Sequence, residues 1–272
     1  MDSDKEKRKF IIDTSAFTVG SNEKIDNGLA NRVHQGLFAQ SEEPLDILNQ
    51  HGLLLAELDN FFRSHDSVFI NEVLKENGNF ISTLKEKIKV VSDYEELARD
   101  DDENTEFNSQ LRLYDRSFAK RLENYVDNFT AFNAYFRRRA FCLDDFNPLQ
   151  KLVYDRVLEK ARRIHLSHKE RGDKQTPGDR LETDRKLIAT SIAMAVKYPV
   201  TLISRDIQLI GEPNLQKVGS LRKVIEECRF WTRTSDGLNV NPQEISVYNP
   251  NRSDNGFYDS EKERVVYERR NN

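Results

Sequence analysis

Short apolar runs alternate along this chain with longer stretches in which apolar residues recur every three or four positions. The runs at 10–12, 67–70 and 200–204 have the length and composition of buried strands. Helical spacing occupies 53–62, 72–90, 185–197 and 221–230. Strands that alternate with helices pair mostly in parallel, because each helix carries the chain back across the sheet. The alternation therefore predicts an α/β fold with a mostly parallel central sheet flanked by helices.

A further helical pattern lies between these segments. Apolar and aromatic residues recur at spacings of three and four from Tyr114 to Phe136, and the pattern resumes from Val153 to His168 after a break at 144–148. We therefore expect an α-helical hairpin inside a helical insertion at 91–175, carried by a main domain at 1–231. The polar stretch 232–272 is predicted to be a C-terminal extension, with one strand at 245–248.

Charge is segregated along the chain although the net charge is only −4. Residues 93–106 are strongly acidic and are predicted to form a solvated loop, whereas residues 137–174 are basic. Within the basic block, five arginines are candidate phosphate contacts: Arg137, Arg138, Arg139, Arg162 and Arg163. The alternative is that these residues solvate a helical surface and pair with Asp155, Glu159 and Glu170.

No part of the chain has the composition of a membrane segment. No run approaches the ~18 apolar residues of a transmembrane helix, and the first nine residues are not followed by an apolar signal-peptide core. The sequence therefore predicts a cytoplasmic protein that does not engage a membrane.

Two aspartates stand where predicted strands end. Asp13 follows the run at 10–12, and Asp206 follows the run at 200–204. Ligands bind beyond the carboxyl ends of parallel strands, so both side chains are expected in one crevice. A third acid, Asp184, begins the helix at 185–197 with Thr183 as a candidate N-cap. Each acid alone is typical of capping or of favourable interaction with the helix dipole, and the functional interpretation depends on their combination.

The three segments together resemble the PIN-domain nucleases. The resemblance lies in Ile-Ile-Asp-Thr-Ser at 11–15, in Thr-Asp-Arg-Lys-Leu-Ile-Ala-Thr at 183–190, and in an apolar strand followed by Ser-Arg-Asp at 204–206. It implies a three-layer PIN-like fold. The 107 residues between Glu76 and Asp184 exceed what compact toxin-type members have, and a helical arm at this place is similar to that of small protein-only ribonuclease P enzymes.

The resemblance also implies an acid in the helix after the second strand. The family commonly has Pro-x-x-Val-x-x-Glu there, and this chain has Ile-Asn-Glu-Val-Leu-Lys-Glu at 70–76, which puts Glu76 at the acidic position without the proline. Glu72, one helical turn earlier on nearly the same face, is the alternative, and Glu57 is a weaker third choice.

The activity implied is that of a metal-dependent endoribonuclease. Mg²⁺ or Mn²⁺ prefers oxygen ligands, and both neutralise the charge that phosphodiester hydrolysis builds up. On this interpretation Asp13, Glu76, Asp184 and Asp206 are the catalytic metal ligands, Ser15 and Ser204 support them or the substrate, and a metal-bound water is the nucleophile. The implied partner is RNA, single-stranded or structured.

The sequence leaves other functions open. One is a catalytically degenerate PIN-like module that binds RNA or protein, and another is a nuclease that prefers branched DNA. A homo-oligomer and an inhibitor protein as partner are also left open.

Overall fold

The computed structural model describes residues 7–17, 42–100, 116–169, 178–216, 218–228, 242–250 and 256–269. The chain divides into two compact units. One comprises Met1–Ala16, Asn60–Val73 and Ala140–Asn272 and contains the sheet, and the other comprises Phe17–Asp59 and Leu74–Arg139 and is helical. We call them the sheet unit and the helical unit.

A mostly parallel sheet forms the centre of the sheet unit. Its described strands have the order β2-β1-β3-β4-β5, with bounds Ser67–Val68, Lys9–Ile12, Val200–Ile203, Ile245–Tyr248 and Arg264–Tyr267. Four strands are parallel, and β5 pairs antiparallel with β4. The register places Ile12 opposite Ile203 and Ile203 opposite Tyr248, so β1, β3 and β4 end together.

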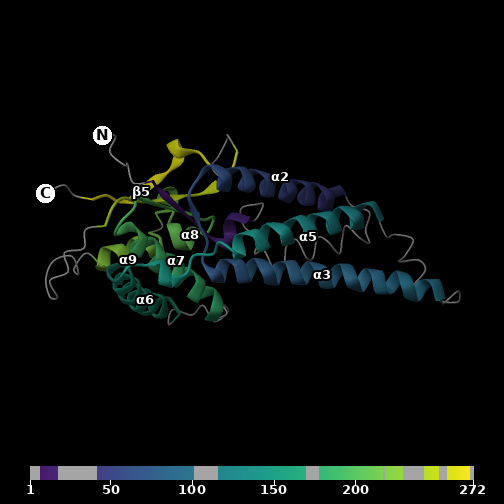
Figure 1. The fold of residues 1–272 in the computed structure, drawn as a ribbon, viewed down its shortest axis with the longest axis horizontal. Helices are drawn as coiled ribbons and strands as arrows, with labels where there is room; N and C mark the ends of the chain where they lie inside the picture. Colours follow the sequence, from purple (N-terminus) through teal and green to yellow (C-terminus); the bar gives the residue numbers. More distant parts are fainter. Residues whose placement is uncertain are drawn as a thin grey trace. The chain divides into compact units, whose positions relative to one another are not determined.

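Helices cover this sheet. The helix α7 (Gly178–Ala195) packs against β1, β3, β4, α6 (Pro148–Lys169) and α9 (Ser220–Cys228), and Figure 1 shows α6, α7 and α9 grouped beside the strands. The short α8 (Ile207–Ile210) packs on α9. The second half of α7 is buried on all sides from Leu187 to Ala195, and Leu202 and Ile203 of β3 are buried against it. Short 3₁₀ turns occupy Thr14–Phe17, Leu143–Asp145, Pro213–Leu215 and Ser260–Lys262.

The helical unit contains long helices, two of which are joined by aromatic packing. They are α2 (Glu42–Ser64), which ends in the sheet unit, α3 (Asn71–Asp100), which begins there, and α5 (Arg116–Arg137). Phe129 of α5 contacts Phe17 and Phe80, with ring centroids 6.2 and 6.0 Å apart. The buried Asn133 donates a hydrogen bond to the carbonyl of Leu74 (3.2 Å), which ties α5 to α3 (Figure 1).

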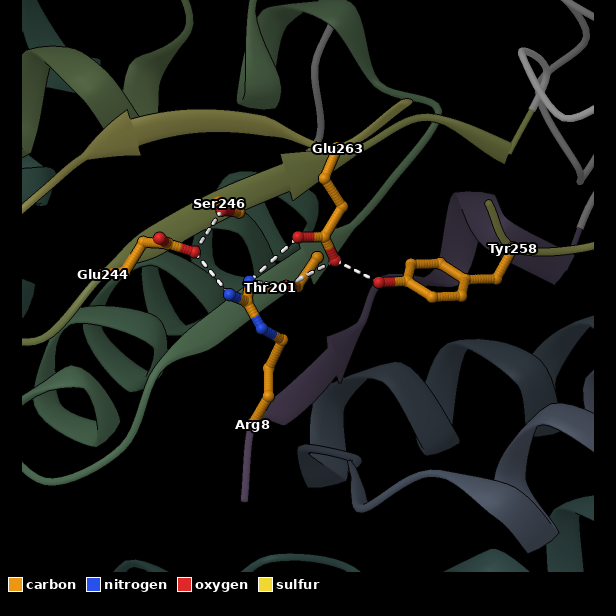
Figure 2. Close-up of polar contacts among 6 residues, drawn as sticks. All are labelled: Arg8, Thr201, Glu244, Ser246, Tyr258 and Glu263. Carbon is orange, nitrogen blue, oxygen red and sulfur yellow. Dashed lines mark hydrogen bonds and ion pairs between the residues drawn. The ribbon is translucent and has the colours of Figure 1, made fainter. Parts of the chain in front are cut away.

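A polar network around Arg8 joins the first strand to the C-terminal strands (Figure 2). The Arg8 guanidinium donates to Glu263 at 2.9 Å and to Glu244 at 2.5 Å, and it also donates to Thr201 at 3.0 Å. Glu263 accepts further bonds from Thr201 and from the Tyr258 hydroxyl. Since Arg8 precedes β1, Glu244 precedes β4 and Glu263 precedes β5, this network fixes the C-terminal strands to the first strand.

The predicted α/β class and mostly parallel sheet are confirmed, and the predicted strands at 10–12, 200–204 and 245–248 match β1, β3 and β4. Between 67 and 70, two residues form β2 and Ile70 adds a bridge to Phe141. None of the helices within the described ranges is both long and apolar enough to cross a membrane.

Several predicted boundaries differ from the observed ones. The residues expected as a hairpin do form α5 and α6, but α6 packs on α7 and α9 in the sheet unit while α5 belongs to the helical unit. The helical unit therefore does not coincide with the predicted insertion at 91–175. The stretch 232–272, expected as an extension, supplies β4 and β5 to the sheet. The acidic stretch is helical as far as Asp100, and its remainder lies outside the described residues.

Candidate active site at the carboxyl ends of the parallel strands

Asp13 is a buried carboxylate at the end of β1. Its backbone N–H donates to the carbonyl of Ile203 (3.0 Å), which extends the β1–β3 ladder by one bond, and its carbonyl accepts from Ala16 N–H in the following 3₁₀ turn. The residue is 5% exposed. The backbone is therefore fixed on both sides of Asp13, and its side chain is held at the carboxyl edge of the sheet.

Two serine hydroxyls hold this carboxylate. Ser15 Oγ and Ser204 Oγ lie 2.5 and 2.7 Å from Asp13 Oδ2, and both donate to it. Ser15 Oγ accepts the backbone N–H of Arg205 (2.8 Å), and Ser204 Oγ accepts that of Asp206 (3.0 Å). Each hydroxyl thus bridges Asp13 to the segment that follows β3.

Asp206 is the second acid of this group. It is the N-cap of α8, where its Oδ1 accepts the backbone N–H of Gln208 at 2.7 Å, and its side chain is only partly buried. Burial raises the pKa of Asp13, the hydrogen bonds from Ser15 and Ser204 lower it, and the charge of Asp206 raises it further. The structure thus brings Asp206 close enough for its charge to act on Asp13.

Asp184 lies on α7, partly buried, and takes part in polar or electrostatic contacts. The helix ends at Ala195, and β3 begins at Val200 on the amino edge of the sheet. Asp184 lies eleven residues before Ala195, which corresponds to about 16 Å of helix. The four steps from Val200 to Ser204 correspond to about 13 Å of strand. Asp184 is therefore near the level of the strand ends, on a helix that packs against β1 and β3.

Glu72 also reaches this edge. It follows β2, whose Val68 pairs with Ile11 of β1, and its Oε1 lies 2.6 Å from Nζ of Lys186 on α7. The charges of Glu72 and Glu182 help burial to raise the pKa of Tyr154 to about 12, which places these acids around one tyrosine of α6. Glu76, one turn later, is partly buried and belongs to the helical unit, and Glu57 is exposed on α2.

Within the described part of the chain, no three His, Cys, Asp or Glu side chains are grouped so that they could hold a metal ion. The structure brings together Asp13, Ser15, Ser204 and Asp206. Among the described residues, neither Glu76 nor Asp184 completes a metal-ligating group of three side chains. Mg²⁺ is commonly held by one or two carboxylates, with water and substrate phosphate completing the shell. The Asp13–Asp206 pair, with two carboxylates at one edge of the sheet, has the donor chemistry of that kind of open site.

Two basic residues next to these acids were not predicted. Arg205 stands between Ser204 and Asp206, and burial lowers the pKa of its guanidinium to about 10. Its Nε and Nη1 are buried without a hydrogen-bond partner in the structure. Lys186 follows Asp184 by two residues. The sequence does contain a signal for both residues, because each lies inside one of the acidic motifs and phosphate sites combine metal ligands with cations.

The predicted arginine contacts separate into two groups. Arg162 pairs with Glu182 at 2.5 Å, and Arg163 pairs with Glu159, so these two follow the alternative of paired surface charges. Arg137, Arg138 and Arg139 are exposed at the end of α5 in the helical unit, where Arg139 lies over the ring of Tyr135 at 4.4 Å.

Comparisons with protein-family models, with curated proteins and with solved structures give no significant match for this chain.

Proposed function

We propose that this chain is a PIN-like, metal-dependent endoribonuclease that hydrolyses phosphodiester bonds of RNA. The proposal includes a three-layer arrangement of the fold and Mg²⁺ or Mn²⁺ as cofactor. The observation that carries it is the convergence of Asp13 and Asp206 through Ser204, because acids 193 residues apart in the chain meet at the carboxyl ends of two neighbouring strands.

The roles follow from exposure and hydrogen bonding. Asp13 and Asp206 would hold the divalent ion, which when bound neutralises charge on the phosphoryl oxygens and makes a water molecule more acidic. Ser15 and Ser204 both donate to Oδ2 of Asp13 and so orient its carboxylate. Asp184, near the level of the strand ends, is proposed as a further acid that acts through water.

A competing function is a degenerate module that binds RNA or protein without cutting it. The observation in its favour is that the described residues contain no group of three metal-ligating side chains. Such a module would bind RNA with a strong dependence on salt and would show no cleavage stimulated by Mg²⁺ or Mn²⁺.

The test is cleavage of a labelled single-stranded RNA with Mg²⁺ or Mn²⁺ by the wild-type chain and by Asp13→Asn. Asp66→Asn is the matched control, because Asp66 precedes β2 at the opposite edge and pairs with Lys9. We expect Asp13→Asn to abolish cleavage and Asp66→Asn to retain it. Equal cleavage by wild type and Asp13→Asn would overturn the proposal. Faster cleavage of branched DNA than of RNA would assign the chain a DNA substrate.

A further inference from the structure

Lys186 is a cation at the carboxyl edge of the sheet that the roles above do not use. Its Nζ lies 2.6 Å from Oε1 of Glu72, and the pair joins α7 to the first turn of α3. The side chains are 28% and 26% exposed. The ammonium is therefore held in place by the fold and is still accessible from solvent.

The position of Lys186 follows from the same helix that carries Asp184. Nine residues separate it from Ala195, which corresponds to about 13 Å of helix and equals the length of the adjacent strand. It therefore stands level with the end of β3, where Ser204 and Asp206 lie. Glu72 reaches it from the end of β2, which independently places the pair at this edge.

The ammonium has bonding capacity beyond its contact with Glu72. A lysine ammonium has three N–H donors, and Glu72 accepts one of them. Among the residues that the structure describes, no second acceptor of Lys186 is seen. The neighbouring Arg185 differs, because its side chain is 13% exposed and bonded to Glu182, so it is less available to a ligand.

The attraction for an anion here comes from the ammonium itself. Near this part of α7, the bases Arg162, Arg185 and Lys186 stand beside the acids Glu182, Glu72 and Asp184, so these described side chains carry no local excess of positive charge. The acids Asp13 and Asp206 repel phosphates unless a cation neutralises them. A lysine at the same edge supplies attraction for a polynucleotide backbone that a carboxylate pair lacks.

We propose that Lys186 binds a backbone phosphate of the RNA substrate and that Glu72 is a positioning residue that orients its ammonium. Glu72 is then the counter-ion of a substrate-binding lysine and not the second metal ligand. This inference rests on the proposed nuclease function.

The test measures binding rather than turnover. A fluorescently labelled single-stranded oligoribonucleotide is titrated in EDTA, so that no cleavage occurs, at salt concentrations between about 50 and 200 mM. The variants are Lys186→Met, Lys186→Arg and Glu72→Gln. Lys160→Met is the matched control, because Lys160 is also 28% exposed and pairs with an acid, Glu227, on another helix.

We expect Lys186→Met to weaken binding several-fold and to reduce the slope of log K against log salt by about 0.7, the value for one phosphate contact to a single strand. Lys186→Arg should keep the slope, and Glu72→Gln should weaken binding less than Lys186→Met does. A slope for Lys186→Met equal to that of Lys160→Met would overturn the role of Lys186 while leaving the nuclease proposal intact. Failure of the wild-type chain both to bind and to cleave RNA would overturn both.

Discussion

Ser204 Oγ donates to Asp13 Oδ2 at 2.7 Å and accepts the backbone N–H of Asp206 at 3.0 Å. One fully buried hydroxyl therefore fixes the position of one acid and the backbone of the other. Ser204 thus links the two acids directly, beside the second bridge that Ser15 makes from Asp13 to the backbone N–H of Arg205.

Ser204→Ala should lower RNA cleavage about 10- to 100-fold, the usual cost of removing a group that orients a ligand. It should also destabilise the fold by about 1–3 kcal/mol, because a buried N–H loses its acceptor. Ser246→Ala is the control, since Ser246 is equally buried on the neighbouring β4 and bonds to Glu244. Cleavage that falls equally in both variants would assign Ser204 a purely structural role.

Asp13→Asn should stabilise the folded protein at neutral pH while it abolishes cleavage. Burial and the charge of Asp206 raise the pKa of Asp13 above its ordinary value of 3.8, so the unfolded chain ionises first as the pH rises. As the pH rises from 3.8 to the raised pKa, ionisation of Asp13 therefore lowers the free energy of unfolding. Above the raised pKa the protein stays less stable by the full amount. Urea unfolding of both proteins at a series of pH values measures the difference, which should vanish below pH 3.8. A less stable Asn variant at neutral pH would contradict this account.

Mg²⁺ or Mn²⁺ should raise the melting temperature of the wild-type chain, because an ion that binds only the folded state stabilises it. An ion at about a hundred times its Kd adds about 2.7 kcal/mol. The increase should be reversed by EDTA and be smaller in Asp206→Asn. Thermal unfolding followed with and without the ion provides the measurement, and an equal increase in both proteins would place the ion elsewhere.

The positions of Asp13 and Asp206 could be predicted because the evidence for them is local. Each follows a short apolar run, and parallel strands place their carboxyl ends at one edge. The serines that support them were found for the same reason, since both lie within two residues of an acid in the sequence.

Other features depend on which surfaces meet in the folded chain, and local patterns do not contain that information. The apolar face of α6 indicates burial, but the pattern does not show that its partner in the sheet unit is α7. The strand β5 is four residues long with charged neighbours, so its pattern resembles a loop. The ion pair of Glu72 with Lys186 joins residues 114 positions apart.

Arg8→Met should destabilise the fold by about 1–3 kcal/mol, because Glu244 and the 11%-exposed Glu263 lose a charged hydrogen-bond donor (Figure 2). Cleavage per folded molecule should be unchanged, since Arg8 and Glu244 precede β1 and β4 at the edge opposite Asp13. Arg163→Met, which breaks an exposed pair with Glu159, should change stability by less than about 1 kcal/mol. Equal urea midpoints for the two variants would show that the Arg8 network contributes little.

Gly219→Ala should damage both the fold and the site. A Cβ at Gly219 would lie 2.3 Å from the backbone nitrogen of Gly211 and 2.4 Å from the carbonyl carbon of Ile210, so the chain at the end of α8 would have to move. Overpacking of this kind costs about 1–3 kcal/mol. Because Asp206 caps α8, the movement should also reduce cleavage by the molecules that remain folded.

Gly52→Ala is the contrasting variant: nothing lies within 4 Å of its Cβ, and alanine inside α2 should stabilise the fold by about 0.5–1 kcal/mol. Urea unfolding and cleavage assays on both variants test the contact, and a Gly219→Ala protein with wild-type stability would refute the close approach of α8 to this glycine.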